Sequence, residues 1–106
     1  ATDQPWKLSM VAFDEEGRVL YNVDKPPESD LEYTWGICCW GPRFTELMHG
    51  YLQALPRSKR EVVLSDVFAA ALDQKLEVWS LCFDDGQYLD IGTADELDQA
   101  LRHFHL

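Results

Sequence analysis

The residue best placed to bind an anion is Lys25, because of what stands on either side of it. It closely follows a run in which apolar and polar residues alternate, from Arg18 to Val23, and Pro26-Pro27 comes directly after it. Tandem proline cannot continue a strand, so the lysine lies at a strand end on a stiff exit. An ammonium is a compact point charge that suits a phosphate oxygen. The pattern indicates an anion site, with an ordinary exposed turn lysine as the alternative.

Asp90 is the second residue whose position suits ligand chemistry. It closes a predicted strand, directly before Ile91-Gly92-Thr93 and a predicted helix. A carboxylate in that place can point at a hard cation beyond the edge of a sheet. Aspartate in a turn also commonly accepts backbone N–H bonds, which is the alternative interpretation. The sequence leaves both open.

Two predicted hairpins and a buried strand would position these residues. Residues 8–13 and 18–23 are predicted strands joined by a turn at 14–17, and 77–83 and 87–91 form a second such pair across Asp84-Asp85-Gly86. Residues 35–40 are apolar on both alternating faces, which is typical of a strand buried on both sides.

Three helices are expected around these strands. The first begins at Gly41-Pro42, carries an apolar stripe from Phe44 to Leu55 and stops at Pro56. The second covers about 67–75 with Ser65 or Asp66 as its N-cap, and the third begins at the capping box Thr93–Glu96. The order β-β-β-α-α-β-β-α predicts a mixed α/β fold in one domain over residues 1–106.

Composition excludes several classes of partner. The chain has 106 residues, and its formal net charge of -10 would repel nucleic acid and anionic membrane surfaces. No apolar stretch reaches the roughly 18 to 20 residues of a membrane span, and no signal peptide is visible. Three cysteines, two of them adjacent, make no disulfide framework, so a reducing cytoplasmic location is expected.

Four segments in order carry a resemblance to a known family: Gly17–Pro26, Trp35-Gly36-Ile37, Glu61–Val67 and Gly86–Thr93. Their succession resembles the second half of the sugar-1-phosphate nucleotidylyltransferases, such as the glucose-1-phosphate thymidylyltransferases, and covers about residues 10–104. The resemblance implies the C-terminal, sugar-binding portion of a Rossmann-like nucleotide-diphospho-sugar transferase fold.

The resemblance also implies roles for particular residues. Lys25 would bind the phosphate of a sugar 1-phosphate, Asp24 would contact sugar hydroxyls, and Glu61 would lie near the sugar. Where many members have a small residue before the central glycine, this chain departs from them with the bulky Trp35 before Gly36, which would narrow the sugar pocket or stack on the sugar ring. Asp90 would be a Mg²⁺ ligand, paired with a second aspartate from an absent N-terminal half. For Glu61, one more charge in a surface turn with Lys59 and Arg60 is the alternative.

Other features depart from the family. The six glycines are scattered and form no phosphate-binding loop, so no residue here is expected to be catalytic, and the chain should be inactive in nucleotidyl transfer when alone. It would then be a fragment or half of a split enzyme of sugar nucleotide biosynthesis. A degenerate non-catalytic binding or oligomerisation module is the alternative, since Leu8-Ser9 replaces the family's aromatic-glycine pair. An exposed sheet edge is expected to promote self-association.

Overall fold

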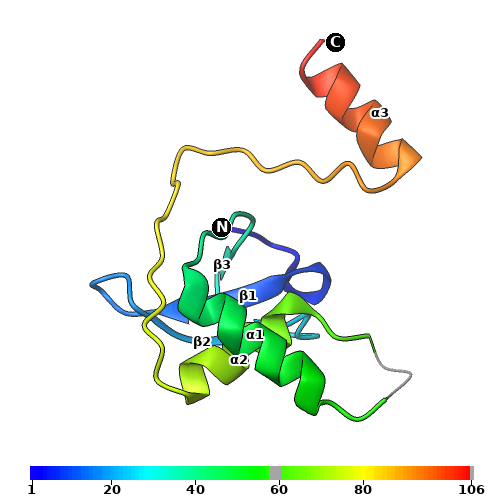
Figure 1. The fold of residues 1–106 in the computed structure, drawn as a ribbon. Helices are drawn as coiled ribbons and strands as arrows, with labels where there is room; N and C mark the ends of the chain where they lie inside the picture. The colour runs from blue at the N-terminus through cyan, green and yellow to red at the C-terminus, as the bar shows by residue number, and fades with distance from the viewer. Residues whose placement is uncertain (58–60, 106) are drawn as a thin grey trace.

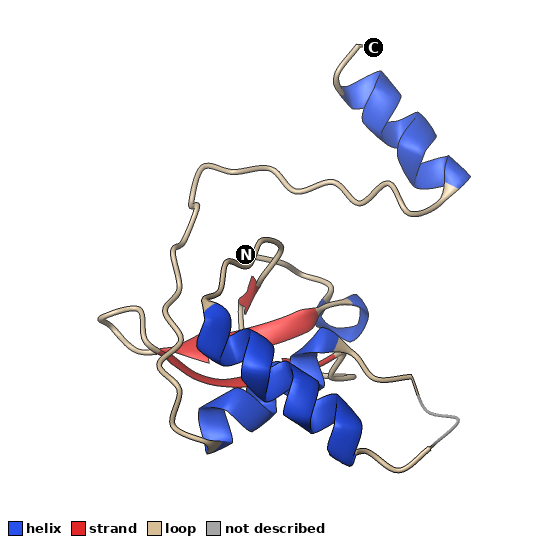
Figure 2. Ribbon diagram, viewed as in Figure 1, coloured by secondary structure: helices blue, strands red, loops and turns tan. Residues whose placement is uncertain are grey.

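The computed structural model describes residues 1–57 and 61–105, and an antiparallel sheet forms its first layer. The strands are β1 (Ser9–Phe13), β2 (Val19–Asp24) and β3 (Tyr33–Thr34), in the spatial order β2-β1-β3. A single 3₁₀ turn, Pro5–Lys7, precedes β1. Figure 2 shows the strands in red behind the helices.

The predicted hairpin of β1 and β2 is confirmed. Its turn is held by Asp14, whose Oδ1 accepts the backbone N–H groups of Glu16 and Arg18 at 3.0 and 2.9 Å. Gly17 has φ +90°, a conformation that glycine adopts without steric cost. The antiparallel register then places Ser9 opposite Asp24.

Two helices form the second layer. α1 (Pro42–Ala54) packs against α2 (Leu64–Asp73), and α2 packs against β2. Phe44, Val67 and Ala71 are the buried centre of this layer, and the Phe44 and Phe68 rings stack with centroids 5.0 Å apart. The predicted apolar stripe on the first helix is thus confirmed at Phe44.

The second helix begins earlier than predicted. Its N-cap is Val63, rather than Ser65 or Asp66, and Ser65 is buried inside the first turn. Asp66 still serves the helix start, because its Oδ2 accepts the N–H of Val63 at 3.4 Å. A carboxylate three residues into a helix can reach back to the cap in this way.

α3 (Ala94–His103) stands apart from the two layers at the end of a long extended segment (Figure 1). Its predicted capping box is confirmed: Glu96 N–H donates to Thr93 Oγ1 at 3.2 Å, and Thr93 N–H donates to Glu96 Oε2 at 3.0 Å. Its large apolar residues are poorly covered: Leu97 and Phe104 are 44% and 55% exposed, whereas the small Ala100 is buried. The radius of gyration is 15.8 Å, against about 13 Å for a compact chain of this size.

Three predicted strands are wrong. Residues 35–40 form no strand, and the third strand is the short β3 just before them. Residues 77–83 and 87–91 form no hairpin, and only an isolated antiparallel bridge joins Trp79 to Arg18. The observed order in the described chain is β-β-β-α-α-α. The fold is therefore a mixed α/β arrangement, and none of the described helices is long and apolar enough to cross a membrane.

Candidate anion-binding site at the end of strand β2

The side chain of Asp24 is held in place by a neighbouring strand. Ser9 Oγ donates a hydrogen bond to Asp24 Oδ1 at 2.5 Å. Thr34 Oγ1 donates in turn to the Ser9 carbonyl oxygen at 2.6 Å, so residues of all three strands meet at this end of the sheet. The contact fixes one carboxylate oxygen and leaves acceptor capacity on the other, because an ionised carboxylate offers about four lone-pair sites.

Lys25 adopts an uncommon backbone conformation beside this carboxylate. Its φ is +44°, and its N–H donates to the Leu8 carbonyl oxygen at 3.1 Å. The left-handed region is costly for a residue with a Cβ. Two other non-glycine residues share it, Lys75 and His105, and each follows a helix end, where this conformation is ordinary. Lys25 has no such helical explanation, so it is the site where backbone strain is concentrated.

The two charged groups of this site face solvent. Asp24 and Lys25 are both exposed, whereas Pro26 next to them is buried and anchors the chain as it leaves the strand. Within residues 1–57 and 61–105, no acidic side chain forms an ion pair with the Lys25 ammonium. The ammonium can therefore approach an anion without first breaking a salt bridge.

Trp35 and Gly36 directly follow Thr34 of β3. The Trp35 ring meets Phe68 edge-on at 5.3 Å, which places the indole against the packed face of α2, and its Nε1 is buried without a hydrogen-bond partner in the described chain. A Cβ added to Gly36 would lie 3.5 Å from the Tyr88 ring, so the glycine is in contact with the C-terminal segment. A role for either residue in contacting a sugar stays a prediction.

Asp90 and Glu61 are not joined to Asp24 or Lys25 by any contact in the described structure. Asp90 Oδ1 accepts the N–H of Gly92 at 3.0 Å, which is the turn geometry named above as the alternative to metal binding. No group of three or more potential ligand residues is gathered anywhere in the described chain. Glu61 is exposed just before α2, and Lys59 and Arg60, which define its alternative, lie outside the described residues.

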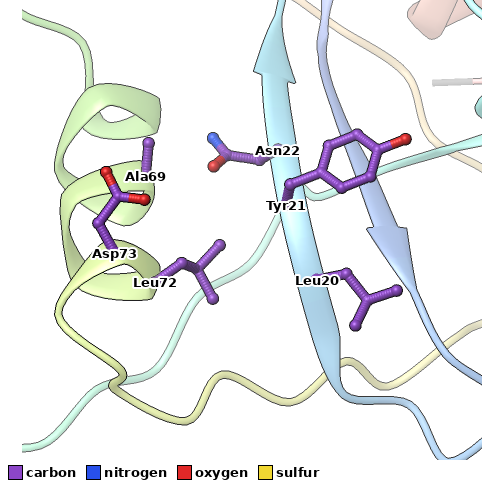
Figure 3. A pocket seen from close by; sticks show the side chains of 6 residues that line it. All are labelled: Leu20, Tyr21, Asn22, Ala69, Leu72 and Asp73. Carbon is purple, nitrogen blue, oxygen red and sulfur yellow. The ribbon is translucent and has the colours of Figure 1, made fainter.

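A shallow hollow between β2 and α2 is one of the concave features beside this strand (Figure 3). The amide of Asn22 reaches from β2 toward α2, and its Nδ2 donates to the Ser65 carbonyl oxygen at 3.0 Å. The hollow's charged side chain is the carboxylate of Asp73, and no basic residue lines it. It is therefore unsuited to a phosphate, in contrast to the end of β2.

Ser9 is the site residue that the sequence did not single out. It is found only through the hairpin register: Ser9 and Asp24 are directly opposed in the ladder on either side of the turn. Pairing the two predicted strands from their turn outward would have opposed Ser9 to Asn22. The register shift between Ala12 and Phe13 brings Ser9 opposite Asp24 instead, so the pair could not be read from the predicted strands.

Comparison with known proteins identified no relative: no family model, no curated protein and no solved structure matches this chain.

Proposed function

We propose that this chain binds a sugar 1-phosphate at the end of β2 and is the sugar-binding part of a nucleotidylyltransferase with a Rossmann-like fold. One observation carries the proposal. Lys25 has a left-handed backbone at a strand end, directly after the carboxylate that Ser9 holds. Residues with a strained backbone are common at ligand-binding sites. There the surrounding structure holds the strained conformation because binding requires it, although it costs stability.

The two side chains would divide the ligand between them. The Lys25 ammonium would bind the phosphate as a point charge. The Asp24 carboxylate would accept hydrogen bonds from sugar hydroxyls, and bonds of this kind to a charged group contribute about 1.5–3 kcal/mol. Its hydrogen bond from Ser9 holds the acceptor in one rotamer, which lowers the entropy lost when a sugar binds. Glu61 would add a further acceptor, while Trp35 and Gly36 would border the sugar.

In the complete reaction, a phosphate oxygen of the sugar 1-phosphate attacks the α-phosphorus of a nucleoside triphosphate, and pyrophosphate leaves from the opposite side. The products are a nucleotide sugar and pyrophosphate. This chain would hold the nucleophile, and a glycine-rich loop absent from its 106 residues would hold the triphosphate. The 106 residues would therefore bind the sugar phosphate without turning it over.

A Mg²⁺ ion would neutralise the phosphate charges during that attack. Asp90 fits as one ligand, because Mg²⁺ is commonly bound through one or two carboxylates together with substrate phosphates. Its Oδ2 accepts no hydrogen bond from the described residues, whereas Oδ1 is used by Gly92. In a longer protein that catalyses the transfer, Asp90→Asn should lower the rate by several orders of magnitude, and a wild-type rate in that variant would contradict the assignment.

Binding of glucose 1-phosphate, measured by isothermal titration or by NMR shifts, tests the proposed function. We expect Lys25→Ala to abolish binding, and Lys75→Ala to leave it unchanged. Lys75 is a matched control, because it is also an exposed lysine with a positive φ, +63°. Equal binding by both variants, or none by the unmodified chain, would contradict the proposal.

The second candidate is a non-catalytic module derived from the same family. Two observations favour it: the Trp35 ring packs against Phe68, and Asp90 Oδ1 is engaged in its own turn. Such a module would bind neither glucose 1-phosphate nor Mg²⁺. The titration above therefore separates the two candidates.

A further inference from the structure

The most conspicuous unpartnered feature of the molecule is the extended segment that follows α2. Its start is fixed to the sheet, because Val19 N–H donates to the Val78 carbonyl oxygen at 2.8 Å and Ser80 N–H donates to the Gly17 carbonyl oxygen at 2.7 Å. The Arg18 side chain contacts the same stretch twice. It forms an ion pair with Glu77, and its Cζ lies over the Trp79 ring, 5.4 Å from the ring centroid. The segment therefore begins with an isolated antiparallel bridge beside the start of β2.

The pairing cannot continue beyond this bridge on the same sheet. In the antiparallel register of the bridge, Trp79 lies opposite Arg18, so Leu81 would fall opposite Glu16. Glu16 belongs to the tight turn between β1 and β2, where Gly17 N–H already bonds to the Asp14 carbonyl oxygen at 3.0 Å. The edge of β2 thus ends where the bridge stands. Beyond it, no backbone hydrogen bond joins residues 81–91 to another segment of the described chain.

The segment nevertheless has the side chains of a buried strand. Trp79, Leu81 and Phe83 alternate with Ser80 and Cys82, and they are 55%, 79% and 69% exposed. In an extended chain such an alternation puts the three large side chains on one face. We call Trp79, Leu81 and Phe83 the apolar stripe. Large side chains present about 150–250 Å² each when bare, so the stripe leaves roughly 400 Å² uncovered.

We propose that the apolar stripe is a dimerisation strand, which pairs antiparallel with the same strand of a second copy of this chain about a two-fold axis through Leu81. The strand is self-complementary in this register. Leu81 would oppose Leu81 of the second copy, and Trp79 would oppose its Phe83, so both stripes lie on one face of a continuous sheet. A slip by one residue would place the apolar side chains against Ser80 and Cys82.

The backbone supports the same register. Since the Val78 carbonyl and the Ser80 N–H face β2, the alternation of a strand turns the N–H and C=O groups of Trp79, Leu81 and Phe83 to the outer edge. These are the groups that would pair with the second copy. The result is a sheet that runs from one β3 to the other without an open edge at its centre.

The lack of charged residues in the apolar stripe favours a second copy of this chain, rather than a basic protein, as its partner. The chain has a net charge of -10, yet no charged residue lies between Glu77 and Asp84. Two copies can therefore pair here without opposing like charges inside the contact. The rest of the two chains repels, so the dimer should be weak and should tighten with salt as the repulsion is screened. The small apolar area also corresponds to the weak end of interface sizes.

Sedimentation equilibrium of the 106-residue chain from about 10 μM to 1 mM measures this association. We expect a monomer–dimer equilibrium whose dissociation constant falls between about 0.15 and 1 M NaCl. Leu81→Asp should abolish the dimer, because it places two carboxylates opposite each other at the axis. Ile37→Asp is the matched control: Ile37 is 85% exposed and lies outside the stripe, so its substitution should leave the dimer intact.

Amide hydrogen exchange supplies a second readout that does not depend on a variant. At high protein concentration we expect the amides of Leu81 and Phe83 to become protected, while that of Cys82 stays fast. A monomer at 1 mM would overturn the proposal, as would a dimer that survives Leu81→Asp, open-ended aggregation, or concentration-independent protection, which would mean that the chain covers its own stripe.

Discussion

The hydroxyl of Ser9 lies 2.5 Å from a carboxylate oxygen of Asp24, across the ladder that joins β1 and β2. The contact makes the carboxylate beside Lys25 a positioned group rather than a freely rotating one. It also gives Ser9 a role in positioning that carboxylate.

Ser9→Ala should weaken the proposed binding of glucose 1-phosphate by about tenfold or more, because a hydrogen bond to a charged group, of about 1.5–3 kcal/mol, positions Asp24. Binding of inorganic phosphate should not change, since that ligand needs only the Lys25 ammonium. Titration with both ligands checks this. Ser9→Thr, which keeps the hydroxyl, should restore the affinity, and failure to do so would mean that Ser9 acts only on the fold.

Lys25→Gly should raise the free energy of unfolding by about 1 kcal/mol, because glycine adopts φ near +44° without the Cβ clash. Lys75→Gly should stabilise to a similar extent for the same reason. Urea denaturation measures both variants. The two differ in function: Lys25→Gly should lose phosphate binding and Lys75→Gly should keep it, so a stable variant with normal binding at position 25 would count against the site.

Asp84→Asn should lower the pKa of Tyr33. The Asp84 carboxylate is the main cause that holds the pKa of this phenol above its ordinary value, with smaller contributions from burial, Cys82 and Glu32. NMR of the Tyr33 ring against pH measures the change. Asp85→Asn is the control, since Asp85 is not among the groups that shift this pKa.

The same shift predicts how stability depends on pH. Folded Tyr33 keeps its proton to a higher pH than the unfolded chain does, so the stability it supports is complete below about pH 10 and is lost as the pH rises through the raised value. Asp84→Asn should shrink that loss. An unchanged alkaline denaturation profile would contradict the influence of the Asp84 carboxylate on Tyr33.

Phe44→Ala should destabilise the chain by about 3–5 kcal/mol, because Phe44 is 6% exposed and stacks on Phe68 at the centre of the core. Phe104→Ala should cost less than about 0.5 kcal/mol, because Phe104 is 55% exposed on α3. Thermal unfolding of the two variants compares them. A large loss at Phe104 would mean that α3 packs on the rest of the chain in solution.

The local elements of this protein could be read from the sequence alone. The hairpin of β1 and β2, the first helix with Phe44 on its buried face, and the Thr93–Glu96 capping box each depend on residues within one turn or one ladder. The spacing of apolar residues, the residue types in a turn and the capping of a helix all depend on residues close together in the sequence. Asp24 and Lys25 were also placed correctly at the end of a strand.

The strands predicted at 77–83 and 87–91 show where that reasoning ends. Alternating apolar residues indicate that a segment is able to form a strand. The segment becomes a strand only if the edge of another strand is available to pair with its backbone. Pairing along the edge of β2 ends at the Arg18–Trp79 bridge, so residues 81–91 find no strand to pair with in the described chain. Sequence pattern carries no information about how long a neighbouring edge is.

By itself, then, the sequence determined which stretches form the hairpin and the helices and which residues stand at the end of β2. Only the tertiary structure decided that Ser9 holds Asp24, that Lys25 has a left-handed backbone, and that Trp35 packs against Phe68. The physical reason is the range of the interactions. Propensity, capping and turns are settled by near neighbours, while pairing, strain and burial depend on residues that only the fold brings into contact.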